Sequence, residues 1–232
     1  MNVKIENLHK DYGGKPVYKN FNIEFEENKV NVLMGESGCG KTTLLNIIAR
    51  LTPYEGKISG ADDKKISYIF QNPRLIGGMT VYKNLEYVLL NIYRKEEREK
   101  IIKDILREVE LSEKETGYPE ELSGGQARRV TLARAFIYPS KIILADEPFT
   151  SLDIGLKYRL INLFKALLKK NPRTVVFVTH DADEAVLMAD KIFILGNNEI
   201  KAELNMNSDK NERDVSSDEC NKIRKEIYKN LI

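Results

Sequence analysis

Apolar and polar residues alternate over two short stretches near the start of the chain. Val3 and Ile5 belong to the first stretch, and Phe21, Ile23 and Phe25 belong to the second. Successive side chains of a strand point to opposite faces of a sheet, so this alternation is typical of half-buried strands. We therefore predict an antiparallel β element within the first 25 residues.

Three later runs are apolar, except for Asn31 in the first, and rich in β-branched residues. They span residues 30–34, 142–145 and 175–178. Parallel strands that are covered on both faces of the sheet have this composition. A fourth run, 192–195, ends at Gly196-Asn197-Asn198, a turn sequence that leads to one more predicted strand. The pattern predicts an α/β core around a buried parallel sheet.

Between these two groups of strands, apolar residues recur with the spacing of helices. One predicted helical face consists of Val81, Leu85, Val88, Leu89 and Ile92, and a second consists of Ile101, Ile102, Ile105, Leu106 and Val109. The charges between Arg94 and Glu110 are typical of a solvated helix surface. We interpret this segment, about residues 72–138, as a helical subdomain inserted into the core.

The end of the chain predicts one more amphipathic helix. Ser216 and Glu219 have the spacing of a capping box, and Ile223, Ile227 and Leu231 recur every four residues. The predicted organisation is one domain over 1–232, with a core of 1–71 and 139–200, the helical subdomain, and a helical tail over 201–232.

Composition narrows the class of protein. The 232 residues are 42% hydrophobic and 31% charged, which indicates one globular domain rather than a disordered chain. The 37 Lys and Arg nearly balance the 35 Asp and Glu, so the net charge of +2 gives no support for nucleic-acid binding. The longest apolar run, 185–189, is far shorter than the roughly 20 residues of a membrane span. The two cysteines, Cys39 and Cys220, lack the spacing of a disulfide framework, which favours a reducing cytosol.

The first buried strand leads directly into a phosphate-binding motif. Residues 35–42 match the pattern G-x-x-x-x-G-K-[ST], and a helix-compatible run follows them. The glycines let backbone N–H groups turn toward phosphate oxygens, while Lys41 can reach the outer phosphates and Thr42 can ligate magnesium. The motif indicates a nucleotide without saying which one. Its predicted binding residues are Gly35, Glu36, Ser37, Gly38, Cys39, Gly40, Lys41, Thr42 and Thr43.

Two carboxylates, Asp146 and Glu147, stand at the end of the second buried strand. A strand tip beside a phosphate loop is where an α/β sheet places its ligand-binding groups. Asp146 would hold magnesium through water, and Glu147 would act as the general base toward the attacking water. Without the phosphate loop, the same pair would be interpreted as a surface turn.

A second anion-binding element lies before the predicted helix 127–136. Ser123, Gly124 and Gly125 would present a hydroxyl and N–H groups at a helix start, flanked by Leu122 and Gln126. The alternative interpretation is a good helix N-cap and no more. One ATP does not need two complete cradles from one chain, unless the two belong to opposite partners. Arg128 and Arg129, just downstream, are predicted to be intramolecular ion-pair partners.

Together these motifs resemble the ATPase subunit of an ABC transporter. The resemblance extends from about residue 3 to about residue 200, with the motifs in the order of that family. It implies that Tyr12 stacks on adenine, that Gln71 is the Q-loop glutamine and that His180 is the switch histidine. It also matches the family's signature to residues 122–126, acting in trans, and the family's D-loop to Ser151, Leu152 and Asp153.

The resemblance has consequences for fold, chemistry and partners. It implies a RecA-like P-loop core, with ATP and Mg²⁺ as cofactors, Glu147, His180 and Gln71 as catalytic residues, and Thr42, Gln71 and Asp146 around the metal. It further implies a dimer of two copies, transmembrane permease subunits and, indirectly, an extracytoplasmic substrate-binding protein. Such a chain would lie peripherally on the cytoplasmic face of the cell membrane.

Finer motifs resemble one subgroup of the family. Residues 70–75, 147–149 and 178–185, together with Arg213-Asp214 in the short tail, look like the ATPases of nitrate, sulfonate and taurine importers. The chain departs from that group at Gly77-Gly78, where the family often shows Pro-Trp. The alternatives are the ATPase of an exporter or of a lipoprotein-release complex, and a soluble ABC ATPase of DNA repair or translation. A regulatory GTPase is disfavoured, because no Asn-Lys-x-Asp motif is present.

Overall fold

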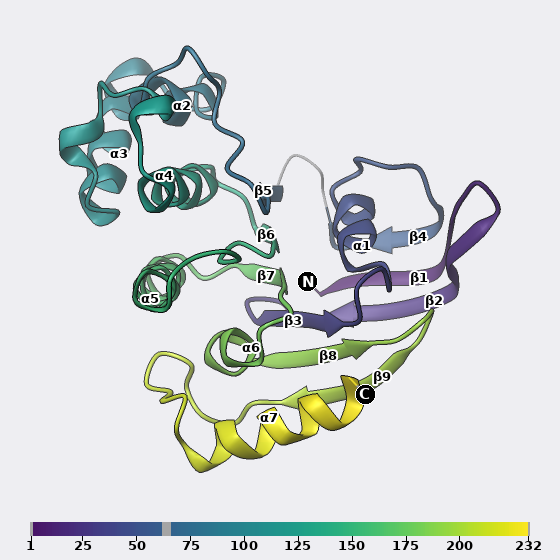
Figure 1. The fold of residues 1–232 in the computed structure, drawn as a ribbon. Coiled ribbons are helices and arrows are strands. Elements are labelled where there is room, and N and C mark those ends of the chain that lie inside the picture. The colour runs from purple at the N-terminus through teal and green to yellow at the C-terminus, as the bar shows by residue number, and fades with distance from the viewer. Residues whose placement is uncertain (1, 62–65, 232) are drawn as a thin grey trace.

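The computed structural model describes residues 2–61 and 66–231. Two sheets organise the fold (Figure 1). The smaller is antiparallel, with β1 (Val3–Tyr12) between β2 (Lys15–Phe25) and β4 (Glu55–Ser59). The predicted antiparallel element is therefore confirmed, and its alternating pattern arises because one face packs on the core while the other is exposed.

The larger sheet has six strands in the order β5-β6-β7-β3-β8-β9. These strands are β3 (Val30–Gly35), β5 (Ile66–Ile69), β6 (Ile142–Asp146), β7 (Thr174–Val178), β8 (Lys191–Leu195) and β9 (Ile200–Asn205). The first five pair in parallel, and β9 pairs antiparallel with β8 after the predicted turn. All predicted buried strands are confirmed, and their carboxyl ends form one edge of the sheet.

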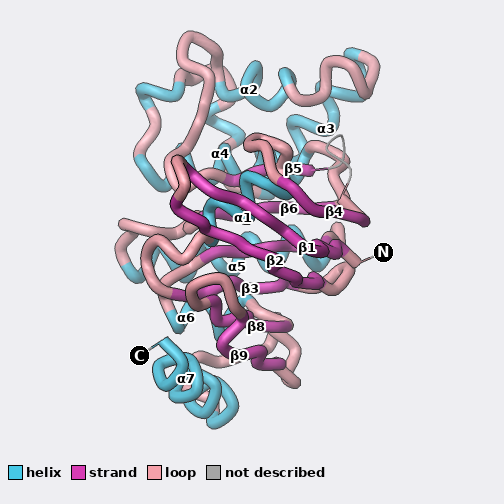
Figure 2. Tube along the Cα trace, turned by 90° about the vertical axis from the view of Figure 1, so that its right-hand side faces the viewer, coloured by secondary structure: helices cyan, strands magenta, loops and turns pink. Residues whose placement is uncertain are grey.

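Both faces of the large sheet are covered, which explains the apolar runs. Val32, Phe177 and Ile194 pack in one hydrophobic cluster with side chains of α2 to α6. Their neighbours, among them Leu33 and Val176, pack in a second cluster with α1 and the antiparallel sheet. Figure 2 shows the antiparallel strands and α1 lying over one face of the parallel strands.

Seven α-helices surround the two sheets in the described part of the chain. They are α1 (Lys41–Ile48), α2 (Val81–Tyr87), α3 (Lys95–Glu108), α4 (Gly124–Ile137), α5 (Ile154–Lys170), α6 (Ala182–Met188) and α7 (Asp218–Leu231). Two 3-10 turns, Ser112–Lys114 and Pro119–Glu121, precede α4. The helices α2, α3 and α4 gather beside the β5 edge, and α7 lies at the opposite end beside β9 (Figure 1). The division into core, helical subdomain and tail stays a prediction.

Two local predictions are wrong. The predicted face from Val81 to Ile92 is not one helix, because α2 ends at Tyr87: Val88, Leu89 and Ile92 lie beyond it, and the Ile92 side chain is 41% exposed. Ser216 does not cap α7: the Ser217 hydroxyl accepts the N–H of Cys220, while Glu219 accepts N–H groups of Asn207 and Ser208. Within residues 2–61 and 66–231, no helix is long and apolar enough to cross a membrane.

Candidate active site

The phosphate loop, residues 35–42, connects β3 to α1, and two of its glycines are required by the backbone. Gly35 has φ +149°, and a Cβ there would come within 2.4 Å of the Leu195 carbonyl oxygen. Gly40 has φ +105°, and a Cβ there would lie 2.8 Å from the Tyr18 hydroxyl. Only glycine fits both positions, so the tight turn that opens α1 toward the loop is specified locally.

Lys41 holds its ammonium group inside the loop. The Lys41 Nζ donates to the carbonyl oxygens of Gly35 and Glu36, both at 2.8 Å, and lies 3.8 Å from the Cys39 sulfur. The residue is only 9% exposed. The fold therefore fixes a positive charge at the N-terminus of α1, where the helix dipole also favours an anion.

A cavity of about 470 Å³ opens over this loop. Tyr12, Val17, Glu147 and His180 line it together with most of the loop, namely Gly35, Ser37, Gly38 and residues 40–43; Glu36 and Cys39 are not part of this lining. The Tyr12 ring is 51% exposed, and the Lys10 ammonium lies 4.5 Å from its centroid. The structure thus brings the predicted adenine-stacking residue, the phosphate loop and two predicted catalytic residues around one space.

Asp146 ends β6 directly beside the loop. The Thr42 hydroxyl donates to Asp146 Oδ1 at 3.1 Å, and the aspartate is only 7% exposed. Burial raises the pKa of Asp146, and the Thr42 hydrogen bond opposes that rise. One hydroxyl and one carboxylate in contact fit Mg²⁺, which takes few protein ligands and keeps waters and phosphate oxygens. Among the described residues, no group of three His, Cys, Asp or Glu side chains forms an alternative metal site.

The other two predicted catalytic side chains, His180 and Gln71, contact Glu147. Its Oε2 lies 3.2 Å from His180 Nδ1 and 3.5 Å from Gln71 Nε2. The backbone at Glu147 is left-handed, with φ +44°, and its N–H donates to the Val178 carbonyl at 3.0 Å. Non-glycine residues adopt this conformation at a cost, and such positions cluster at functional sites. The turn after β6 therefore points the carboxylate toward the end of β7, where His180 follows.

The signature segment lies elsewhere in the same chain. Ser123 caps α4 by accepting the Gln126 N–H, and the Gln126 side chain accepts the Ser123 N–H in return. Gly124 is exposed, and a Cβ there would meet no atom within 4 Å. None of residues 122–126 is among the described residues that line the cavity. The structure therefore separates the two predicted anion cradles within one chain.

The predicted D-loop leads into α5. Asp153 caps that helix by accepting the Leu156 N–H at 2.9 Å, while Ser151 adopts a left-handed backbone with φ +64°. Leu152 is partly buried against the core. These three residues form the exposed turn between Glu147 and α5.

Sequence reasoning missed several contacts of the site. Arg128 is not an ion-pair partner: its Nη1 and Nη2 donate to the carbonyl oxygens of Phe70 and Gln71 at 3.1 and 2.6 Å. The Arg129 prediction is confirmed, since that side chain pairs with Glu110 at 3.4 Å. Thr150 was not singled out, yet its hydroxyl donates to Glu147 Oε2 at 3.0 Å. A hydroxyl three residues after a candidate base was the available signal for Thr150.

Comparisons with known proteins agree with this site. Residues 18–150 match the family described as "ABC transporter". The sulfate/thiosulfate import ATP-binding protein of Mannheimia succiniciproducens is 38% identical over 87% of this chain, and the match spans only 60% of that relative. The taurine import ATP-binding protein of Escherichia coli O157:H7 is 37% identical over 83% of this chain and 79% of its own length.

A solved structure shares the fold. It is a dimeric ATP-binding cassette in a post-hydrolysis state, bound to ADP and Pi. Its TM-score is 0.77 at 33% sequence identity, and the match covers 89% of this chain and 99% of the other. The predicted fold class is thereby confirmed.

Proposed function

This chain belongs to the ABC transporter family, and from that premise we propose that it hydrolyses ATP to drive transport by a membrane complex. The main support for the proposal is that Tyr12, the phosphate loop, Glu147 and His180 line the same cavity. A nucleotide base on Tyr12 would place its phosphates against Lys41 and the N-terminus of α1. The terminal phosphate would then face Glu147.

Phosphoryl transfer requires the protein chiefly to position the reacting groups and to stabilise the charge that develops on the phosphate oxygens. Glu147 would take the proton from a water as that water attacks the terminal phosphorus, while the bond between that phosphorus and the ADP oxygen breaks. Thr150, Gln71 and His180 hold the Glu147 carboxylate by their contacts with Oε2. Lys41 would stabilise the charge on the phosphate oxygens. Mg²⁺ would add positive charge there, with Thr42, Gln71 and, through water, Asp146 as its protein groups.

Each active site would be shared by two copies of the chain. Ser123 and Gly124 are exposed at the N-terminus of α4, away from the cavity of their own chain. Their N–H groups and hydroxyl would cover the terminal phosphate bound to the other copy. The D-loop turn, Ser151 to Asp153, would lie at the same interface. This arrangement gives both anion cradles a role.

The partner that receives the energy would be a pair of transmembrane permease subunits. The segment after Gln71 exposes Arg74, whose guanidinium lies 3.9 Å from the Phe70 centroid, and three exposed apolar side chains lie close together in the sequence at the end of α2. They are Tyr87, Leu90 and Ile92, and are called here the α2 patch. Docking of a membrane subunit on the α2 patch would place the chain on the cytoplasmic face of the membrane.

The proposed cargo is a small anion taken up by import. Relatives named for the import of sulfate or thiosulfate, taurine and aliphatic sulfonates support this class, while other relatives are named for Fe(3+) and for spermidine or putrescine. Nitrate and sulfonates belong to the same class of small anions. An extracytoplasmic binding protein would then deliver the anion to the permease.

Replacing Lys41 by alanine tests the proposal. The variant should lose at least nine-tenths of wild-type ATP turnover and bind ATP more weakly, because a charge-assisted contact to phosphate contributes about 1.5–3 kcal/mol. Lys103→Ala, an exposed lysine of α3, serves as the matched control and should keep the wild-type rate. Phosphate release with ATP and Mg²⁺ is the measurement. A Lys41→Ala protein that keeps more than half of the wild-type rate would contradict the site.

A further inference from the structure

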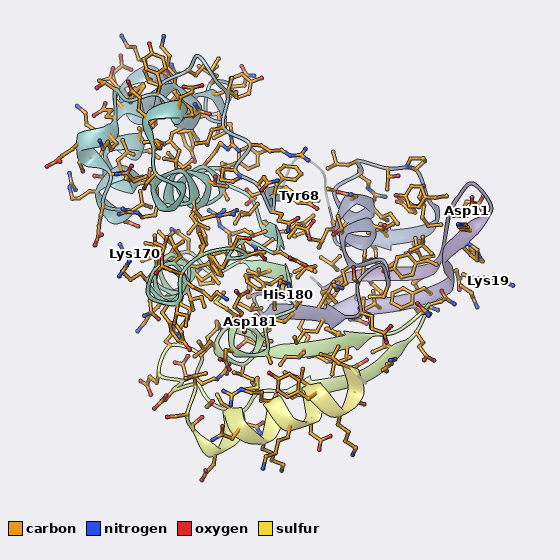
Figure 3. All side chains as sticks on the ribbon, in the orientation of Figure 1. Asp11, Lys19, Tyr68, Lys170, His180 and Asp181 are labelled. Carbon is orange, nitrogen blue, oxygen red and sulfur yellow. The ribbon has the colours of Figure 1, made fainter. Side chains whose placement is uncertain are left out.

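His180 lies just before α6, a helix too short to be stable without contacts to the rest of the protein. It stands between the end of β7 at Val178 and the start of α6 at Ala182 (Figure 3). The helix α6 has only seven residues, whereas isolated helices below about 12–15 residues are marginal in water. The His180 side chain is itself 63% exposed. The position of His180 therefore depends on whatever fixes α6.

Side chains around the first turn of α6 hold the residues next to His180. The Asp181 carboxylate caps the helix by accepting the Asp183 N–H at 2.8 Å. Lys157 of α5 binds Asp181 at 2.6 Å and Glu184 at 3.2 Å. The Thr179 hydroxyl donates to Glu184 at 2.7 Å. The backbone on both sides of His180 is thus tied to the start of α6.

The C-terminal segment adds a contact at the same end of α6. Arg224 of α7 pairs with Asp183 at 2.8 Å, and the Arg224 side chain is only 22% exposed. Its Nη2 also donates to the Val215 carbonyl at 2.8 Å. The guanidinium therefore links the first turn of α6 to α7 and to the loop before α7. Asp183 lies three residues after His180 in the sequence.

The same segment holds the other end of α6. Arg213, 7% exposed, donates through Nη1 to the carbonyl oxygens of Val186 and Ala189 at 2.6 and 2.7 Å. The last carbonyls of a helix lack partners inside the helix, so this guanidinium satisfies groups that α6 leaves open. Cys220 and Ile227 of α7 are fully buried in the same hydrophobic cluster as α6.

We propose that residues 206–231, which we call the C-terminal clamp, position His180 for ATP hydrolysis. The clamp grips α6 at both ends, and α6 in turn sets where the His180 imidazole meets Glu147. Arg224 and Arg213 are thus positioning residues, remote from the nucleotide. The inference rests on the proposed function, because it takes His180 and Glu147 to act together in hydrolysis.

The test compares Arg224→Ala with Lys222→Ala, which removes an exposed cation from the same helix. Arg224→Ala should lower kcat for ATP about three- to tenfold while KM changes less than about twofold, because misplacement acts on the chemical step. Lys222→Ala should leave both constants unchanged. A variant in which Arg224→Asp is combined with Asp183→Arg should be more active than either single variant, since the pair is restored with its charges exchanged.

The chain has two histidines, His9 and His180, so NMR of the imidazole C–H groups gives a readout that a loss of stability alone would not move. The His180→Ala variant identifies the His180 signal. Arg224→Ala should shift that signal in the nucleotide-free protein and leave the His9 signal, on β1, unchanged. An unshifted His180 signal, or an unchanged kcat, would overturn the clamp.

The turnover of His180→Ala separates the two claims. If His180→Ala hydrolyses ATP at the wild-type rate, the proposed active site is wrong. If His180→Ala loses turnover while Arg224→Ala keeps it, the proposed function stands and only the clamp is wrong.

Discussion

Asp146 is a buried carboxylate with few hydrogen bonds to compensate its charge. It is 7% exposed, and the Thr42 hydroxyl donates to it at 3.1 Å. Burial raises its pKa above the ordinary carboxyl range, which means that the folded state holds the proton more tightly than the unfolded state. In the absence of a cation, the ionised form therefore destabilises the fold, and a bound cation such as Mg²⁺ would relieve that cost.

Replacing Asp146 by asparagine should therefore stabilise the nucleotide-free protein while abolishing turnover. We expect the melting temperature to rise by roughly 2–4 °C near pH 7.5, as for a change of about 1 kcal/mol in a chain of this size. The gain should shrink toward acid pH, because the wild-type carboxyl is then protonated in both states. Calorimetry at several pH values measures this, and a fall in melting temperature at neutral pH would contradict the burial argument.

Residue patterns predicted the phosphate loop, the carboxylate pair and His180, since each depends on a local motif beside a strand end. The contacts between them depend on topology. Thr150 meets Glu147 because the backbone at Glu147 is left-handed, and Gln71 meets Glu147 because β5, which precedes Gln71, pairs with β6. The spacing of Thr150 from Glu147 is visible in the sequence, but the left-handed turn and the pairing of β5 with β6 are not.

The helix α4 connects two parts of the proposed site. Its first turn carries Ser123 and Gly124, and one turn later Arg128 donates to the carbonyl oxygens of Phe70 and Gln71. Arg128 is 5% exposed, and burial lowers its pKa. The guanidinium therefore ties α4, which follows the predicted signature, to Gln71, the predicted Q-loop glutamine, of the same chain. Movement of one element relative to the other must break these hydrogen bonds.

Replacing Arg128 by methionine should destabilise the fold more than the same change at Arg129. Two partly buried carbonyl groups would lose a donor at Arg128, a loss of about 1–3 kcal/mol. Arg129 also donates to the carbonyl oxygens of Val109 and Glu110, but its side chain is 24% exposed and its partner carboxylate on Glu110 is 86% exposed, so its loss should be smaller. Chemical denaturation of both variants measures the difference. Equal losses would show that the Arg128 contacts contribute nothing beyond those of a surface pair.

At the level of elements, strands were predicted more accurately than helix ends. The buried runs are short, apolar and bounded by polar residues, so their type and approximate limits are visible in the sequence. Ile92 fits a helical period from Val81 yet lies beyond the end of α2. Ser216 has capping-box spacing, but the neighbouring Ser217 takes the cap because Asp214 binds the Ser216 hydroxyl and N–H. At the start of α7, competing local hydrogen bonds therefore decide which serine caps the helix.

On the scale of the whole molecule, the α2 patch is the surface proposed to meet the membrane partner. Tyr87, Leu90 and Ile92 are 56%, 47% and 41% exposed. Three large apolar side chains close together in the sequence indicate an interaction surface rather than a solvated one. Leu51, 60% exposed after α1, offers a matched control at a distant place in the sequence.

A variant with Leu90→Asp and Ile92→Asp should fold and hydrolyse ATP normally but lose its membrane subunits. Each introduced carboxylate would be desolvated on docking, which costs free energy unless it finds a partner. Leu51→Asp should keep the complex. Co-purification from detergent extracts of cells that express the chain measures this. Recovery of equal amounts of membrane subunits with the wild type and with both variants would exclude the α2 patch as the docking surface.

The central claim is that two copies of the chain share each ATP. Glu147→Gln should slow hydrolysis while preserving the size of the side chain, so ATP should hold the variant as a dimer. Gly124 is exposed, and a side chain there meets no atom of its own chain within 4 Å, so Gly124→Asp should not disturb the fold. In the dimer the new carboxylate would face the terminal phosphate of the other copy, where like charges repel.

Size-exclusion chromatography with ATP and Mg²⁺ tests this claim most directly. If two copies share each ATP, we expect Glu147→Gln to elute as a dimer, while the double variant with Gly124→Asp should still bind ATP but elute as a monomer. A double variant that forms the ATP-dependent dimer as readily as Glu147→Gln alone would contradict the shared site.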